Sequence, residues 1–270
     1  MAIVTISRGS FTGGVAVAEA LAAALGYPCV SREVVRDAAV RSGVSEDRLQ
    51  ATLEEPPRFW EMTPGKIPSH LNLIRTALLR RAHDGDLVYH GYAGHLLLSG
   101  VPRVVRVRVI SDDASRIRAA MRDHQLDEKQ AAEFVRKLDV QLTKWTKFLY
   151  GVAWQDPALY DVVLNLEELS VEGAVATLVG MTRLDDFRAT PDSRKALDDL
   201  LLASEVWSAL TVDAHTRSAN VRVSAADGSV FVTGSAGSDR VLTAIEAVAA
   251  AVPGVRGVQS EVGVGGTWQW

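Results

Sequence analysis

The sequence predicts an α/β fold, in which a five-stranded parallel sheet covered by helices on both faces precedes a small α-β-β-α-β module. Short β-branched runs alternate with helical segments over residues 1–182. After a polar stretch, two alternating runs flank the pair Asp227-Gly228, which is a strong hairpin signal. Hydrophobic residues make up 47% of the chain and charged residues 23%, so we expect a sizeable buried core.

The larger domain is expected to begin with a buried strand. Residues 2–7 (AIVTIS) are short, apolar and β-branched, as in a central strand of a parallel sheet. A Gly-containing turn follows, and then an Ala- and Leu-rich helix that Gly26 ends. Further strands are expected at 27–30, 87–90, 104–110 and 162–165, and helices at 15–25, from about 32, after 45, and at 71–82, 114–122, 128–150 and 171–182.

The segment 54–69 contains four prolines and cannot form one regular helix. Its aromatic pair, Phe59 and Trp60, favours a loop or short helix that folds over a surface.

The second module is expected to have helices at 195–210 and 240–252 and strands at 221–224, 230–233 and 254–264. The predicted organisation is therefore a first domain at 1–182, a linker at 183–194, the module at 195–264 and a tail at 265–270. Two tryptophans, Trp268 and Trp270, lie in that tail.

Composition excludes several classes of function. The formal net charge of −4 provides no overall attraction for nucleic acid or anionic lipid. Cys29 is the only cysteine, which excludes an internal disulfide and a Cys-rich metal site and favours a reducing compartment. The N-terminus lacks the features of a signal peptide, and no apolar run approaches the roughly 20 residues of a membrane span. We expect a cytoplasmic location.

The candidate cofactor-binding residues follow the first strand. A strand, a Gly-containing loop and a helix form a phosphate-binding loop, because amides at the helix N-terminus point at the anion. A full Walker A motif adds a lysine for the terminal phosphates and a hydroxyl for magnesium. Here those two positions are Gly14 and Val15, and Val15 cannot ligate a metal. The loop consists of Arg8, Gly9, Ser10, Phe11, Thr12, Gly13, Gly14 and Val15.

A metal site is not favoured. His83, His90 and His95 lie near Asp84 and Asp86 in the sequence. However, His90 ends a predicted buried strand and His95 begins a helix, so packing at a strand end is the better interpretation.

Four segments, in order, resemble the cytidylate-kinase-like family of P-loop kinases over residues 1–180. They are ISRGSFTGGVAVAEALAAALGYP, SREVVRDAAVRSGVS, GYAGHLLL and LTKWTKFLYGVAWQDPALYDVVLN. The resemblance implies a five-stranded parallel sheet, an ATP site with magnesium at the loop, a nucleoside-monophosphate site and a mobile lid.

Several positions where the family carries phosphate-handling groups differ in this chain. The arginine that follows the paired glycines is Val15, and the acidic residue before Arg-Glu is Ser31, next to Arg32. The Gly-Arg-Gly turn is Gly91-Tyr92-Ala93. The resemblance makes these positions the candidate substrate-binding residues: Ser31, Arg32, Gly91 and Tyr92.

The lid pattern Arg-x-x-Asp-x-x-Arg keeps Arg136 and Asp139 but has Leu142 at its last position. Phosphoryl transfer depends on cations that neutralise the transferring group, and losing one such arginine costs roughly 10³-fold or more in rate. The catalytic residues are therefore unknown, and the candidates are Arg8, Arg136 and Asp139.

The second module resembles a BON domain, through Gly228-Ser229-Val230, Thr233-Gly234 and the segment Val252-Pro253-Gly254-Val255. That family is associated with binding phospholipid or partner proteins and carries no catalytic residues. Residues 195–264 hold five basic and eight acidic residues, so attraction to an anionic membrane is not favoured. Docking to a protein partner or self-association is expected.

Three functions remain open. The first is a degenerate kinase that binds a nucleotide and acts as a regulatory or interaction protein through the BON module. The second is an active CMP kinase that uses ATP. The third is a self-associating scaffold that binds no nucleotide.

Overall fold

The computed structural model describes residues 2–54, 69–91 and 94–265. The proline-rich segment with Phe59 and Trp60, the candidate Tyr92 and the tail tryptophans lie outside these ranges. In the described part of the chain, no helix is both long and apolar enough to cross a membrane.

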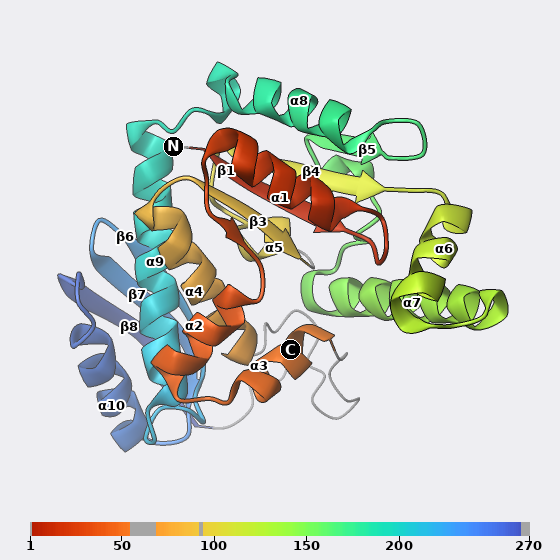
Figure 1. The fold of residues 1–270 in the computed structure, drawn as a ribbon. Coiled ribbons are helices and arrows are strands. Elements are labelled where there is room, and N and C mark those ends of the chain that lie inside the picture. The colour runs from red at the N-terminus through yellow and green to blue at the C-terminus, as the bar shows by residue number, and fades with distance from the viewer. Residues whose placement is uncertain (1, 55–68, 92–93, 266–270) are drawn as a thin grey trace.

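The predicted α/β fold is confirmed (Figure 1). Five strands form one sheet in the order β2-β3-β1-β4-β5, and every pairing is parallel. Their bounds are β1 (Ile3–Arg8), β2 (Cys29–Val30), β3 (Leu87–Gly91), β4 (Val104–Ile110) and β5 (Val162–Asn165). Because β1 is the central strand, the loop that follows it lies at the carboxyl edge of the sheet, between β3 and β4.

Helices cover both faces of this sheet, and successive strand residues pack into separate cores. Ile3 belongs to the core beneath α2 and α4, whereas Val4 belongs to the core beneath α1 and α8. The helices are α1 (Gly14–Leu25), α2 (Glu33–Ser42), α3 (Glu46–Glu54), α4 (Ser69–Asp84), α5 (Gly94–Leu97), α6 (Asp113–His124), α7 (Glu128–Tyr150) and α8 (Val171–Thr182).

Helices α6 and α7 form a hairpin that projects beyond the carboxyl edge of the sheet (Figure 1). Side chains of Asp112 and Asp127 cap the two helix N-termini. The hairpin has a small core of its own around Ala120, Ala131 and Val135. Leu142, Trp145 and Leu149, toward the C-terminal end of α7, pack into the core of the first domain. The N-terminal half of α7 and α6 also contact the loop after β1, as described below.

The second module has the predicted α-β-β-α-β order. It consists of α9 (Pro191–Val212), β6 (Asn220–Ala226), β7 (Ser229–Ala236), α10 (Asp239–Ala250) and β8 (Gly257–Val264). β6 and β7 are antiparallel, and β8 adds parallel to β7. Asp227 and Gly228 both have positive φ, 49° and 78°, as a two-residue hairpin turn of type I′ requires.

Helix α9 contributes to two cores. Leu197 packs in the core of the first domain, whereas Val206 and Leu210 pack in the core of the second module. The helix starts at Pro191, inside the segment expected to be a linker, because Pro191 occupies the first helical turn and Thr190 caps it. The division of the chain into domains stays a prediction.

A buried polar cluster joins α9 to α4. Asn72 Nδ2 donates to the Ser204 carbonyl oxygen at 3.1 Å, and the Ser204 hydroxyl donates to Asn72 Oδ1 at 2.9 Å. The Thr76 hydroxyl lies 2.8 Å from that of Ser204 and 2.9 Å from that of Ser208. Buried hydrogen bonds of this kind fix the relative position of two helices, because a shift would leave desolvated polar groups without partners.

Candidate functional site

The loop after β1 has the geometry of an anion-binding site. Gly13 adopts φ 80° at the N-terminus of α1, and no side chain caps that end of the helix. The first turn also has no acidic residue. A Cβ on Gly14 would lie 2.7 Å from Cβ of Arg8, so glycine is needed for α1 to start this close to β1. The helix amides are therefore available to an anion at this edge of the sheet.

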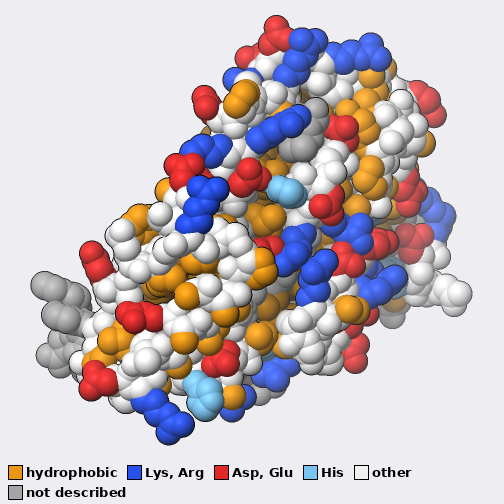
Figure 2. All heavy atoms as spheres, turned by 90° about the vertical axis from the view of Figure 1, so that its left-hand side faces the viewer, with side chains coloured by type: hydrophobic (Ala, Val, Ile, Leu, Met, Phe, Trp, Pro, Cys, Tyr) orange, Lys and Arg blue, Asp and Glu red, His pale blue; other side chains and the backbone are white. Residues whose placement is uncertain are grey.

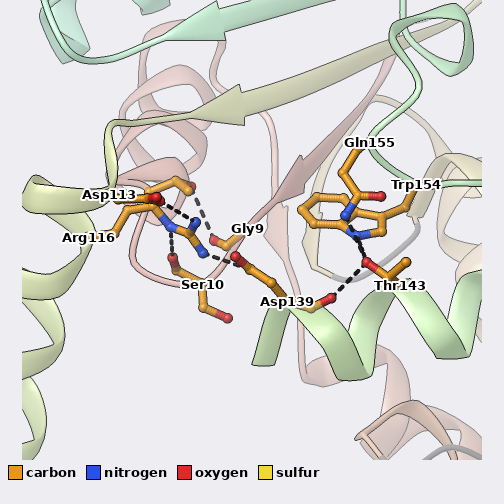
Figure 3. Close-up of polar contacts among 9 residues, drawn as sticks. Gly9, Ser10, Asp113, Arg116, Asp139, Thr143, Trp154 and Gln155 are labelled. Carbon is orange, nitrogen blue, oxygen red and sulfur yellow. Dashed lines mark hydrogen bonds and ion pairs between the residues drawn. The ribbon is translucent and has the colours of Figure 1, made fainter. Parts of the chain in front are cut away.

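Arg116 of α6 holds the loop in place. Its side chain is buried, and Nε donates to the Ser10 carbonyl oxygen at 3.0 Å. Nη2 lies 2.7 Å from Asp139 on α7, and Nη1 lies 3.3 Å from Asp113 (Figure 3). Two carboxylates thus balance this guanidinium, whose donors are directed to protein groups. We infer that Arg116 positions the loop.

The hydrogen-bond network that includes Asp139 continues along α7 to Thr143 (Figure 3). The Thr143 hydroxyl donates to the Asp139 carbonyl oxygen at 2.8 Å. It also accepts hydrogen bonds from Trp154 Nε1 at 3.1 Å and from Gln155 Nε2 at 2.7 Å. The predicted catalytic candidate Asp139 therefore lies within a network that links the loop, α6, α7 and the segment before β5.

Phe11 provides a second link between the loop and the hairpin. Its φ of 62° is unusual for a residue with a side chain. The ring lies 5.5 Å from that of His124 and 6.0 Å from that of Phe134. Packing against the hairpin compensates for the strained backbone, so the loop and the α6–α7 hairpin form one packed unit.

A cleft of about 1000 Å³ opens in front of the loop. Among the described residues, its charged lining comprises two arginines, Arg8 and Arg32, and two carboxylates, Glu19 and Asp123. Arg8 also affects its neighbours on β3. Burial raises the pKa of Tyr89 to about 12, and the positive charge of Arg8 acts against this rise. Burial lowers the pKa of His90, and Arg8 lowers it further.

The α7 side of the cleft is largely apolar. Phe134, Leu138, Leu142 and Trp145 recur at helical spacing and line the cleft, with Gln141 between them. Arg136 and Lys137 are exposed and do not line it. Of the residues that the structure describes, only Arg8 and Arg32 bring positively charged side chains to this cleft.

The structure brings together part of the predicted site. The cleft is lined by Arg8, Ser10, Phe11, Gly13, Val15 and Arg32. The loop positions Gly9, Thr12 and Gly14 lie outside this lining and shape the loop, and the Thr12 hydroxyl donates to the Gly9 carbonyl oxygen at 3.2 Å. Gly91 ends β3 and Ser31 precedes α2, and neither lines the cleft.

Sequence reasoning missed Arg116. The helix after β4 begins at the same sheet edge as the loop after β1, because β1 and β4 are parallel neighbours. An arginine one turn into that helix, with Asp113 three residues before it, was the available signal.

The three histidines do not converge. In the described ranges, no group of three or more His, Cys, Asp or Glu side chains could hold a metal ion. His83 Nε2 lies 3.3 Å from Asp198 on α9, whereas His90 and His95 are buried. Both ring nitrogens of His95 lack a hydrogen-bond partner, and its ring lies 4.6 Å from that of Tyr160.

His95 is expected to make folding stability depend on pH. Burial, together with the nearby charge of Arg106, lowers the pKa of His95 to about 4. The unfolded chain binds this proton more tightly, so stability is highest above about pH 6.5 and falls as the pH drops toward 4, by on the order of 2–3 kcal/mol. In urea unfolding from pH 4 to 7, His95→Phe should flatten this dependence. An unchanged slope would contradict the assignment.

With this geometry established, comparison with known proteins gives the family. Residues 3–168 match the model of the cytidylate kinase-like family. The chain belongs to that family. Residues 198–266 match the model of the BON domain. None of the curated proteins matches the chain.

Comparison with solved structures gives three matches over about two thirds of the chain. An uncharacterized protein from Eubacterium ventriosum covers 67% of this chain and 98% of its own, with 19% identity and a TM-score of 0.52. A shikimate kinase from Bacteroides thetaiotaomicron covers 68% and 99%, with 12% identity and a TM-score of 0.41. A shikimate kinase from Acinetobacter baumannii covers 67% and 92%, with 11% identity and a TM-score of 0.38. The first of these supports the fold alone.

Proposed function

We propose that this protein is a degenerate member of its family, which binds a nucleotide at the loop after β1 without transferring a phosphoryl group efficiently. The observation that supports this most directly is the apolar α7 wall of the cleft. There, Phe134, Leu138, Leu142 and Trp145 face the cleft, while Arg136 lies outside it.

The apolar wall argues against phosphoryl transfer because it supplies no positive charge to the cleft. Transfer between two nucleotides requires cations around the reacting phosphoryl group. In the described lining, Arg8 and Arg32 are balanced by Glu19 and Asp123. Arg116 is close to the loop but already bonded to two carboxylates. Such a cleft can hold one phosphorylated ligand but offers little additional stabilisation to a transition state.

The residues fit ATP and magnesium only in part. The uncapped N-terminus of α1 and the positive φ of Gly13 suit a phosphate group. Val15 occupies the place of the magnesium-binding hydroxyl and brings no oxygen ligand. We therefore expect nucleotide binding that depends little on magnesium.

The BON module would transmit the bound state to a protein partner. Helix α9 contributes leucines to the core of the first domain and to the core of the second module. Its position against α4 is fixed by the Asn72–Ser204 hydrogen bonds. A ligand that shifts the first domain would thereby act directly on the helix that begins the module.

Thermal shift with CMP, CDP and ATP, each with and without magnesium, tests the proposal together with a coupled assay for ADP formation. We expect stabilisation by at least one nucleotide and no steady turnover. Arg8→Ala should weaken binding roughly tenfold or more, since a charge-assisted contact contributes about 1.5–3 kcal/mol.

Arg36→Ala is the matched control, because Arg36 is exposed on α2 and does not line the cleft. Steady turnover of CMP and ATP that Arg8→Ala abolishes would replace the proposal with an active CMP kinase, in which Arg8 and Arg32 would be the cations that line the cleft. If no nucleotide binds, both the proposal and the active-kinase hypothesis are wrong, and the self-associating scaffold is the hypothesis that remains.

A further inference from the structure

The sheet of the BON module has one covered face and one open face. Val221, Val230, Val232 and Val262 point toward α9 and α10 and are buried with Val206 and Ile245 of those helices. Their strand neighbours point the other way, where no described element covers them. The open face is formed by Arg222, Ser224, Ala226, Ser229, Phe231, Thr233, Gly257, Gln259 and Glu261, most of them exposed.

Phe231 places an aromatic side chain on this face. It lies on the central strand β7, and 36% of its surface is accessible to solvent. The residues that pair in register with Phe231, and so form one row across the sheet with it, are Ser224 on β6 and Gln259 on β8, which are smaller or polar. The aromatic ring therefore lies at the centre of a face whose other side chains are either small or polar.

The next row carries opposite charges on its two outer strands. Arg222 of β6 pairs in register with Thr233 of β7, which pairs in register with Glu261 of β8. Both charged side chains are exposed. Because Thr233 separates them by two strand spacings, roughly 9–10 Å, they do not neutralise each other directly.

This arrangement is complementary to itself. If a second copy packs face to face about a two-fold axis parallel to β7, β6 of each copy lies over β8 of the other. Arg222 then lies opposite the partner's Glu261, at both ends of the row, and the two Phe231 rings meet near the axis. A two-fold axis across the strands would instead place β6 over β6 and like charges over like charges.

We infer that the open face of the BON sheet is a homodimer interface with its two-fold axis along β7. Two aligned sheets pack about 10 Å apart. The face covers roughly 400 Å² per copy, about half of what a standard stable interface buries. The dimer is therefore weak, and its two ion pairs determine its specificity more than its affinity.

A charge-swap series in the full-length chain tests this interface by analytical ultracentrifugation over a concentration range at low salt. Arg222→Glu and Glu261→Arg each replace two attractions with two repulsions, so each should weaken dimerisation at least tenfold. The double variant restores attraction at both positions and should dimerise like the wild type. Most tellingly, an equimolar mixture of the two single variants should form a heterodimer, because both of its ion pairs are again opposite in sign.

Arg240→Glu is the matched control, since Arg240 is exposed on α10, on the covered side of the sheet, and should leave dimerisation unchanged. Phe231→Ser should weaken dimerisation without changing the far-ultraviolet circular dichroism. A strictly monomeric wild type, or single variants that dimerise like the wild type, would overturn the inference. A mixture that stays monomeric would exclude the proposed axis.

Discussion

Replacing Arg116 with alanine is expected to destabilise the protein by about 3 kcal/mol and to release the α6–α7 hairpin from the loop after β1. Removing one partner of a buried ion pair costs about 3–5 kcal/mol, because the other partner is left without compensation. Asp139 retains 29% exposure of its side chain, so the lower end applies. The Ser10 carbonyl oxygen also loses its bond to Nε. Urea unfolding measures the change.

Hydrogen exchange distinguishes this specific release from general destabilisation. The amides of Gly9–Gly13 and of α6 should lose protection at Arg116→Ala more than those of β6 and β7. Arg116→Lys keeps the charge but loses the fork that reaches both Ser10 and Asp139, so an intermediate cost is expected. Arg118→Ala, on the exposed side of α6, is the control and should change stability by less than about 0.5 kcal/mol. Equal effects of both alanine variants would argue against a positioning role.

Gly234→Ala is expected to disrupt the second module, with a cost of about 3 kcal/mol or more. Gly234 has φ 136°, and a Cβ there would lie 2.1 Å from the backbone oxygen of Asn220 and 2.9 Å from Cα of Val221. Both are backbone atoms of β6, so no side-chain rotation relieves the clash and the β6–β7 pairing must open.

Gly237→Ala is the matched control. Nothing lies within 4 Å of a Cβ at Gly237, and its φ is outside the left-handed region, so stability should stay within about 0.5 kcal/mol of the wild type. Differential scanning calorimetry of both variants provides the comparison. Because α9 contributes to both cores, we expect Gly234→Ala also to lower the transition temperature of the first domain. A Gly234→Ala protein with wild-type stability would contradict the described strand pairing.

Much of the fold could be predicted because its signals are local. The periodicity at 128–150, 104–110 and 162–165 matches α7, β4 and β5 residue for residue. Asp227-Gly228 marked the hairpin because its two positive φ angles are a property of the turn itself. The start of α9 was placed four residues late, because Pro191 interrupts a helical pattern in sequence but fits the first turn of a helix.

Less of the candidate site could be predicted from the sequence. Its glycines and Arg8 could be named as candidates because the loop and the helix that follows it are contiguous along the chain, whereas Arg32 came from the resemblance to the family. Which side of α7 faces the cleft depends on how the hairpin docks, so the exposure of Arg136 had no local signal.

By itself, the sequence determined the order of strands and helices along the chain, the glycine-containing turn after β1, the absence of a hydroxyl at Val15, and the family. Each of these depends on residues close together in the chain. Only the tertiary structure decided that Arg116 serves the loop, that Asp139 holds Arg116, and that α9 belongs to two cores. These depend on contacts between residues far apart in sequence, such as Ser10 with Arg116 and Asn72 with Ser204, whose energies depend on burial and geometry.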